Sequence, residues 1–312
     1  IIPRFLTRRN YQIISKNTER FISNHIQTVD FFKGIKNPSK KEIEQYEVFV
    51  VGSDQVWRKE YNQYVENYFF DFLKGRNDKK RLVYAASFGL ESIDIDEKYK
   101  RCFELLKDVE AISVREDSAV KILKEQANID AIHVLDPTLL LEKEDYLALI
   151  EEEDQKINDN ILMCYVLDKT DFKTNIIKEV SAKLNLNILE VMPQEVFNSN
   201  FKSDISKSVY PSVSKWIAGF RDAKFVVTDS FHGVIFSIIF QKPFIVIGNE
   251  NRGMARFDSL LEIFKLENRL LMNEIKLSPY ILSEKIKWDN VNVIIKNLQN
   301  NAYAFLKNSL NL

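Results

Sequence analysis

The fold is decided by the stretch Phe225–Phe240, which has the sequence FVVTDSFHGVIFSIIF. Its first residues are apolar and largely β-branched, and this composition predicts a buried strand. Polar residues 228–230 end the strand, and the apolar run 233–240 predicts a helix. The order of strand, polar turn and helix is the repeating unit of a parallel sheet covered by helices.

The same unit recurs along the rest of the chain. We predict strands at residues 47–51, 82–87, 111–114, 132–135, 161–166, 188–191, 225–228 and 244–247. Helical patterns fall at residues 97–107, 117–126, 173–184, 213–223, 233–240 and 291–310. This alternation predicts parallel sheets with helices on both faces. The fold class is therefore α/β.

The length of the chain suggests two lobes. A chain of 312 residues with 45% apolar residues can bury about two domain cores. The segment 142–160 is acidic and free of glycine, which is typical of a connection between lobes. We therefore predict an N-terminal lobe over residues 1–150 and a C-terminal lobe over residues 151–312, with the last helix packing back across the lobes.

The charge and cysteine content exclude several classes of protein. The net charge of -1 provides no overall field that would attract nucleic acid. Cys102 and Cys164 stand alone in apolar surroundings, without a metal-ligand spacing or a disulfide framework. The apolar run 233–247 is interrupted at Gln241-Lys242-Pro243 and cannot span a bilayer. We expect a soluble, metal-independent cytoplasmic protein with reduced thiols.

Candidate binding residues stand at strand ends, because ligands of open parallel sheets bind at the carboxyl ends of strands. Five such ends carry polar residues: Gly52-Ser53-Asp54-Gln55, Ala86-Ser87-Phe88-Gly89, Ser113-Val114-Arg115-Glu116, Leu135-Asp136-Pro137-Thr138 and Thr228-Asp229-Ser230-Phe231-His232-Gly233. Each also fits a plain turn or helix cap when taken alone. For Arg115 the plain alternative is a salt bridge with Glu116 or with a neighbouring helix.

Of the three histidines, His232 alone lies in a strand-end loop, where proton transfer makes physical sense. His25 falls in an amphipathic helical pattern and His133 on an apolar strand, and both patterns favour a structural role. A loop at residues 248–256 contains Arg252 and Arg256, which fit either a second anion grip or a solvated loop.

Taken in order, these motifs resemble the polysaccharide pyruvyl transferase family over residues 46–272. The resemblance implies a fold like that of GT-B glycosyltransferases, in which two Rossmann-like lobes face a cleft. It also implies phosphoenolpyruvate as the donor and no cofactor. The product would be a pyruvyl ketal on a sugar of a bacterial surface polysaccharide or of its lipid-linked precursor.

The resemblance also suggests roles for the motif residues. His232 would be the general acid, and Asp229 and Asp54 would activate the acceptor or orient His232. Arg115 would clamp the donor, and the other substrate-binding residues would be Ser53, Ser87, Ser230, Arg252 and Arg256. Family members commonly carry arginine in place of Ser230, so Arg252 or Arg256 would substitute for it here.

The start of the chain departs from the family pattern. No strand with a Gly- and Asn-containing turn precedes Tyr46, and the chain begins Ile1-Ile2-Pro3 without Met. We therefore expect the first lobe to be N-terminally incomplete. The expected partners are a sugar or lipid-linked oligosaccharide and membrane-bound glycan assembly enzymes, which would place the protein peripherally at the inner face of the membrane.

Two other functions fit the same sequence. One is a glycosyltransferase that uses a nucleotide sugar, since the two-lobed architecture would be shared. Binding of a nucleoside diphosphate would distinguish it. The other is a non-catalytic partner in a glycan assembly complex, which an examination of the reading frame upstream of Ile1 would test.

Overall fold

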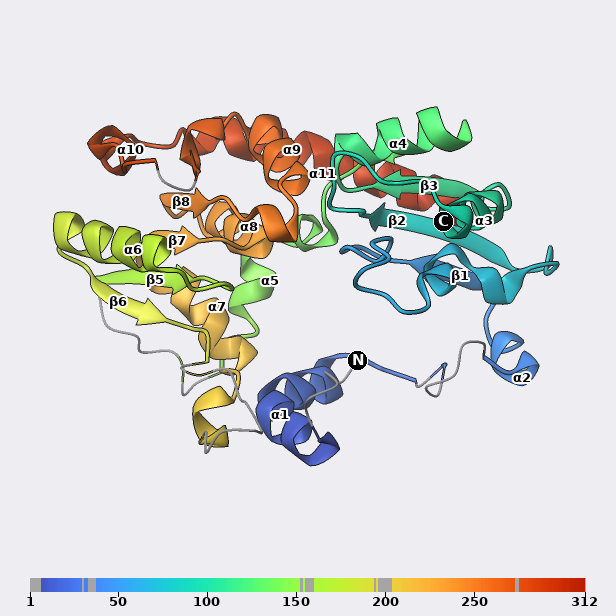
Figure 1. The fold of residues 1–312 in the computed structure, drawn as a ribbon, viewed down its shortest axis with the longest axis horizontal. Coiled ribbons are helices and arrows are strands. Elements are labelled where there is room, and N and C mark those ends of the chain that lie inside the picture. The colour runs from blue at the N-terminus through green and yellow to red at the C-terminus, as the bar shows by residue number, and fades with distance from the viewer. Residues whose placement is uncertain are drawn as a thin grey trace. The chain divides into compact units, whose positions relative to one another are not determined.

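The computed structural model describes residues 7–29, 31–32, 38–151, 154, 160–193, 195, 204–272 and 275–311. The chain forms two compact units. Unit 1 consists of residues 1–29, 142–248 and 268–286, and unit 2 consists of residues 30–141, 249–267 and 287–312. Each unit contains one parallel β-sheet with packed helices, which confirms the predicted α/β class (Figure 1).

These units are not the contiguous lobes that we expected to divide near residue 150. Residues 1–29 group with unit 1, and residues 249–267 and 287–312 group with unit 2. The last helix, α11 (Trp288–Leu310), is fixed to unit 2 by side chains. Gln299 donates to the Leu139 carbonyl at 2.9 Å, and Tyr303 donates to the Leu140 carbonyl. The helix thus packs back onto the unit that contains residues 30–141.

The sheet of unit 2 has the strand order β1-β2-β3-β4 and is parallel throughout. Its elements between residues 40 and 140 are α2 (Lys40–Ile43), β1 (Val48–Val51), the 3-10 helices η1 (Val65–Phe69) and η2 (Asp71–Leu73), β2 (Lys80–Ala86), α3 (Glu97–Leu106), β3 (Ala111–Val114), α4 (Asp117–Ala127), β4 (Ile132–His133) and η3 (Pro137–Leu140). Later residues add η6 (Glu250–Arg252), α9 (Ala255–Phe264) and α11. All four strands lie at predicted positions.

A bulge in β2 sets the two faces of this sheet. The register shifts between Val83 and Ala86, and Ala85 adopts a left-handed φ of 54°. Tyr84 and Ala85 therefore both pack with α11, whereas Val83 and Ala86 pack with α3 and α4. The Ser113 hydroxyl holds the bulge, because it accepts from the Ala85 N–H and donates to the Val83 carbonyl. Helices thus cover both faces, as predicted.

The sheet of unit 1 has the strand order β6-β5-β7-β8-β9, again all parallel. Its elements are α1 (Arg8–His25), α5 (Lys143–Leu147), β5 (Ile161–Tyr165), α6 (Asp171–Leu184), β6 (Asn187–Glu190), η5 (Ile205–Ser208), α7 (Val213–Asp222), β7 (Ala223–Thr228), α8 (Phe231–Ile239), β8 (Phe244–Ile247), β9 (Leu270–Leu271) and α10 (Pro279–Ser283); η7 (Glu267–Arg269) spans the boundary with unit 2. The chain leaves β5 to one side for β6 and returns to the other side for β7. The carboxyl ends of β5 and β7 therefore form a topological switch point, where open α/β sheets bind ligands.

Several helices begin where the sequence provides a side-chain cap. Asp96 accepts from the N–H groups of Lys98 and Tyr99 at the start of α3. Thr170 caps α6 and Ser212 caps α7 in the same manner. None of the described helices is long and apolar enough to cross a membrane.

Two predicted elements differ from the structure. Among the described residues of the acidic connecting segment, α5 begins where residues 142 and 145 cap each other. The predicted loop 248–256 contains η6 and the first turn of α9, so Arg256 lies on a helix. α8 begins at Phe231, which places His232 in the first helical turn instead of in a loop.

Candidate functional site

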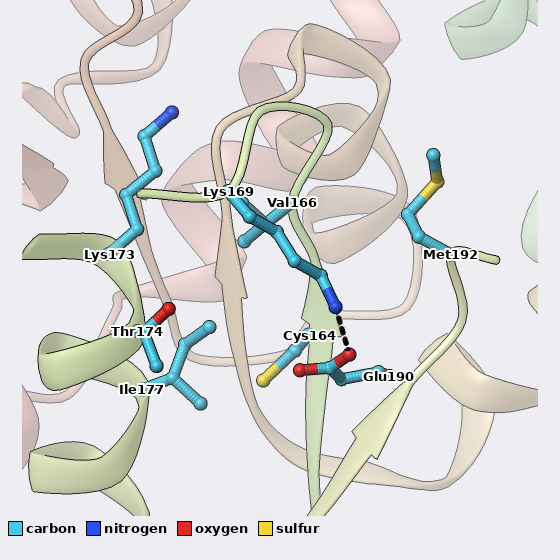
Figure 2. A pocket seen from close by; sticks show the side chains of 8 residues that line it. All are labelled: Cys164, Val166, Lys169, Lys173, Thr174, Ile177, Glu190 and Met192. Atoms are coloured by element: carbon cyan, nitrogen blue, oxygen red, sulfur yellow. Dashed lines mark hydrogen bonds and ion pairs between the residues drawn. The ribbon is translucent and has the colours of Figure 1, made fainter. Parts of the chain in front are cut away.

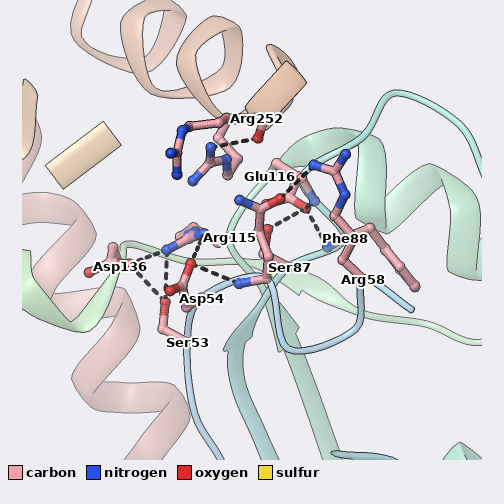
Figure 3. Close-up of polar contacts among 12 residues, drawn as sticks. Ser53, Asp54, Arg58, Ser87, Phe88, Arg115, Glu116, Asp136 and Arg252 are labelled. Atoms are coloured by element: carbon pink, nitrogen blue, oxygen red, sulfur yellow. Dashed lines mark hydrogen bonds and ion pairs between the residues drawn. The ribbon is translucent and has the colours of Figure 1, made fainter. Parts of the chain in front are cut away.

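Arg115 is the centre of a polar cluster in unit 2, at the end of β3. Its Nη1 atom donates to Asp136 Oδ2 at 2.8 Å and to Ser53 Oγ at 3.3 Å, and its Nη2 atom donates to Asp54 Oδ1 at 3.3 Å (Figure 3). The side chains of Arg115 and Asp136 are 1% and 2% exposed. Ser53 also donates to Asp136, at 2.7 Å. Three predicted strand ends thus meet at one guanidinium.

From the sequence, Glu116 was one candidate for a salt bridge with Arg115. In the structure Arg115 pairs with Asp136, and Glu116 binds other groups. Glu116 is fully buried, and its Oε1 atom accepts from the Ser87 hydroxyl and from the N–H groups of Phe88 and Gly89, each at 2.9 Å (Figure 3). Ser87 is also fully buried. Its hydroxyl therefore fixes the turn after β2, and the strand ends of β2 and β3 are tied by one carboxylate.

Asp136 forms the predicted turn and also binds side chains from two other strand ends. Its Oδ1 atom accepts from the N–H and the hydroxyl of Thr138, which caps η3. Its Oδ2 atom binds Arg115 and Ser53. Asp54, by contrast, has a side chain that is 66% exposed. It adopts a φ of 79°, which is unusual for a residue other than glycine and occurs preferentially at functional sites.

Arg252 and Arg256 belong to the same unit and lie beside this cluster. Arg256 Nη2 donates to the Arg252 carbonyl at 2.8 Å, and Figure 3 shows Arg252 in one view with Arg115 and Asp54. The connecting Gly253 has a φ of 90°, and a Cβ atom there would lie 1.8 Å from the Gly89 carbonyl oxygen. The loop that carries Arg252 thus rests on the turn after β2, at a contact that only glycine permits.

The electrostatics of the two buried arginines differ. Burial lowers the pKa of Arg115, but the carboxylates of Asp136, Glu116 and Asp54 outweigh this effect, and the net pKa is raised. Burial and then the charge of Arg115 lower the pKa of Arg256 to about 10, although Asp54, Glu116 and Tyr61 oppose the shift. Burial and the neighbouring guanidinium thus disfavour the charged form of Arg256 more than the nearby carboxylates favour it, which shows that the two arginines lie close enough to interact.

In unit 1, Asp229 occupies the switch point of the sheet. Its Oδ1 atom accepts from the Leu167 N–H at 2.6 Å, and its Oδ2 atom accepts from the Asp168 N–H at 3.2 Å and from Lys173 Nζ at 2.6 Å. The side chains of Lys173 and Asp229 are 5% and 0% exposed. These contacts tie the ends of β5 and β7 to the first turn of α6.

A small pocket opens between β5, α6 and β6 (Figure 2). Its lining consists of Cys164, Val166, Lys169, Lys173, Thr174, Ile177, Glu190 and Met192. Lys169 and Glu190 form an ion pair across it. Burial raises the pKa of the Cys164 thiol, so this sulfur is a poor nucleophile.

The other predicted residues of unit 1 surround the start of α8. Ser230 is buried, and its N–H donates to Thr228 Oγ1 at 3.0 Å. His232 is partly exposed in the first turn of the helix. Gly233 is required there, because a Cβ atom would lie 2.1 Å from Thr228 Oγ1. The strand end and the helix start are therefore closely packed.

His25 and His133, for which we predicted structural roles, each contact a neighbouring group of the fold. His25 ends α1 and packs on Phe21 at 4.5 Å between ring centroids. His133 Nε2 lies 2.9 Å from the Arg115 carbonyl oxygen, where it can donate a hydrogen bond.

Arg58 and Lys173 belong to these clusters although the sequence does not single them out, and Gln55 was named only as part of a strand-end motif. Gln55 Oε1 accepts from Arg58 Nη1 at 3.0 Å, and a Cβ atom on Gly89 would lie 2.2 Å from that oxygen. Lys173 stands in a helical pattern, where a charged residue is usually solvated. Its burial, its hydrogen bond to the Asp168 carbonyl and its ion pair with Asp229 distinguish it, and the ion pair joins residues 56 positions apart. No signal in the sequence could reveal it.

Comparison with known proteins gives one family match. The sequence model described as polysaccharide pyruvyl transferase matches residues 8–251. No curated protein matches the chain.

Two kinds of solved structure show similarity to this chain. The wall teichoic acid polymerase TagF has 10% identity and a TM-score of 0.40, with 96% of this chain and 93% of that chain covered. A second structure of this polymerase has 10% identity and a TM-score of 0.42, with 98% of this chain and 99% of that chain covered. The glycotransferase of kitacinnamycin has 12% identity and a TM-score of 0.39, with 81% of this chain and 65% of that chain covered.

Proposed function

This chain belongs to the polysaccharide pyruvyl transferase family, and we propose that it transfers a pyruvyl group from phosphoenolpyruvate to a pair of sugar hydroxyls. Membership of this family indicates that the chain is a transferase that acts on polysaccharide and that its acceptor is a glycan. The donor, the ketal product and the lipid-linked or surface glycan as acceptor are our proposals. Peripheral contact with membrane-bound glycan assembly enzymes is proposed on the same basis.

The observation that carries the proposal is the arginine cluster of unit 2. Phosphoenolpyruvate has a carboxylate and a phosphate, and guanidinium groups bind both in bidentate geometry. Arg115 already binds Asp136, Ser53 and Asp54. We therefore assign it to positioning Ser53 and Asp54, and we assign the grip on the donor to Arg252 and Arg256. The hydrogen bond from Arg256 to the Arg252 carbonyl, and the effect of Arg115 on the pKa of Arg256, support this assignment because they place these arginines beside one another.

The proposed reaction adds a proton to the methylene carbon of phosphoenolpyruvate, which becomes a methyl group. The central carbon then bonds to one sugar oxygen, whose proton passes to the base, and its bond to the phosphate oxygen breaks. A second sugar oxygen closes the ketal, and its proton leaves with the phosphate. Inorganic phosphate is the other product.

His232 is the proposed proton donor. Asp54 is the proposed base for an acceptor hydroxyl, because its side chain is exposed and held by Arg115. Asp229 is proposed to support the strand ends, because its oxygens already bind Lys173 and two N–H groups.

Ligand-induced stabilisation tests the donor. Phosphoenolpyruvate at a hundred times its dissociation constant should raise the free energy of unfolding by about 2.7 kcal/mol. The Arg256→Lys variant should lose most of the thermal shift, because a lysine lacks the planar fork. Arg76→Lys is the matched control, since Arg76 forms surface ion pairs with Glu44 and Asp78 in the same unit. A shift with UDP and none with phosphoenolpyruvate would favour the nucleotide-sugar glycosyltransferase instead.

A further inference from the structure

Three exposed tyrosines follow the first polar strand end of unit 2. Tyr61, Tyr64 and Tyr68 are 45%, 42% and 36% exposed, and they lie within eight residues of one another. Isolated apolar side chains on a surface need no explanation, but three aromatic rings in so short a segment do. We call them the tyrosine segment.

The buried side of the same segment is firmly anchored. Trp57 is fully buried and stacks on Phe69 at 5.0 Å between ring centroids. Its Nε1 atom donates to the Tyr68 carbonyl at 2.9 Å. Asn62 Nδ2 lies within hydrogen-bonding distance of three carbonyls, those of residues 55, 56 and 58. The exposed rings are therefore held in place before any ligand binds, which lowers the entropic cost of binding.

Tyr61 also adjoins the arginine cluster. The Arg58 guanidinium lies 4.4 Å from the centroid of the Tyr61 ring, and its Nη1 atom donates to Gln55. The same Nη1 atom lies 3.5 Å from the position of a Cβ atom on Gly253, next to Arg252. Tyr61 is close enough to influence the pKa of Arg256. One ring thus stands at the rim of the proposed donor site.

We propose that the tyrosine segment is the acceptor subsite and that Tyr61 binds the apolar face of a neutral hexopyranose. This inference rests on the proposed function, because it identifies where the acceptor of that reaction binds. Tyr64 and Tyr68 extend the surface for further sugars of a glycan chain. The proposal makes Tyr61 a substrate-binding residue beside the donor, not a residue that takes part in bond making.

The chemistry of the rings favours a sugar over other ligands. A pyranose presents several C–H bonds on one face and hydroxyls around its edge. An electron-rich aromatic face attracts the polarised C–H bonds, and the cation of Arg58 covers part of the Tyr61 ring. The phenol hydroxyls and the guanidinium can bind sugar hydroxyls at the edge. Tyrosine provides such amphipathic contact area with little loss of side-chain entropy.

Saturation-transfer NMR tests the subsite without requiring turnover. The probes are the methyl β-glycosides of glucose, galactose and N-acetylmannosamine, each with the intact chain. We expect saturation of the C–H protons on one sugar face for at least one probe. The signal should be lost in Tyr61→Ala and kept in Tyr61→Phe. Tyr280→Ala is the control, because Tyr280 is 68% exposed and belongs to α10 in unit 1.

Turnover with the bound probe gives a second measure. Tyr61→Ala should raise the acceptor KM about threefold to tenfold, the effect of losing one aromatic contact, and should raise it more than it raises the KM for phosphoenolpyruvate. An unchanged signal in Tyr61→Ala, or no signal for any probe with the wild-type chain, overturns the subsite. Loss of the signal in Tyr61→Ala together with a complete absence of pyruvyl transfer would instead support the sugar subsite and contradict the proposed reaction.

Discussion

Arg115 and Asp136 carry opposite charges in a place that water does not reach. Their side chains are 1% and 2% exposed, and they are 2.8 Å apart. Removing one partner leaves the other charge buried and uncompensated, which is far more costly than losing a surface pair. Asp136→Ala should therefore lower the free energy of unfolding by about 3–5 kcal/mol, as measured by urea denaturation.

Two further variants test whether the uncompensated buried charge causes that loss of stability. Lys107→Ala removes an exposed pair with Glu104 and should cost less than about 1 kcal/mol. Arg115→Met combined with Asp136→Leu removes both charges and should be less destabilising than Asp136→Ala alone. Equal losses for Asp136→Ala and Lys107→Ala would show that the buried pair has no special role in stability.

The two cysteines lead to a prediction about pH. Burial raises the pKa of the Cys102 thiol to about 12 and also raises that of Cys164. An unfolded thiol titrates near about 8.5. Above this pH the unfolded chain loses protons that the folded chain retains, so the thiols should make the free energy of unfolding fall as the pH rises toward 12.

Iodoacetamide labelling at pH 8 checks the thiols directly, because only the thiolate reacts. Both cysteines should be labelled in urea and protected in the native protein. Rapid labelling of Cys102 or Cys164 in the native protein would contradict their burial. A variant with both cysteines replaced by Ala should retain turnover, since neither is assigned a part in the reaction.

At the scale of elements, the loop that precedes α9 depends on Gly253. Gly253→Ala would place a Cβ atom against the Gly89 carbonyl and force the loop of Arg252 away from the turn after β2. Gly75→Ala is a matched control, because Gly75 also has a positive φ, of 78°, but no atom lies within 4 Å of its Cβ position. Both variants should lose about 1–3 kcal/mol, because each places a residue with a Cβ atom at a positive φ.

Only Gly253→Ala should lose more stability than this and also weaken the thermal shift with phosphoenolpyruvate. The measurement is the melting temperature of both variants with and without the donor. Similar behaviour of the two variants would mean that the contact of Gly253 with Gly89 does not position Arg252.

The elements with strong periodicity could be predicted from the sequence, and those defined by tertiary contacts could not. β3, β8 and α3 lie within one or two residues of their predicted limits, because short apolar runs and the Asp96 cap are local signals. β9 has only two residues and is defined by pairing with β8. The bulge at Ala85 depends on Ser113, which is 28 residues away in the sequence.

At the scale of the whole molecule, the division of the chain into two units could not be predicted from the sequence. The chain crosses from one unit to the other several times, and composition changes little at residues 249, 268 and 287. The candidate site shows the same limit. The strand-end rule correctly selected Ser53, Ser87 and Arg115 as neighbours of the carboxyl edge, but it could not predict that Asp136 would pair with Arg115.

The central claim is that the chain forms a pyruvyl ketal from phosphoenolpyruvate. The most direct test measures acceptor-dependent phosphate release from phosphoenolpyruvate, with the ketal methyl group detected by NMR, for the wild-type chain and His232→Asn. Release should require both substrates, and His232→Asn should lower turnover by about 10²–10⁴-fold with little change in donor affinity. Phosphate release at a near-normal rate in His232→Asn would remove the proposed acid, and the absence of any ketal from the wild-type chain would contradict the account itself.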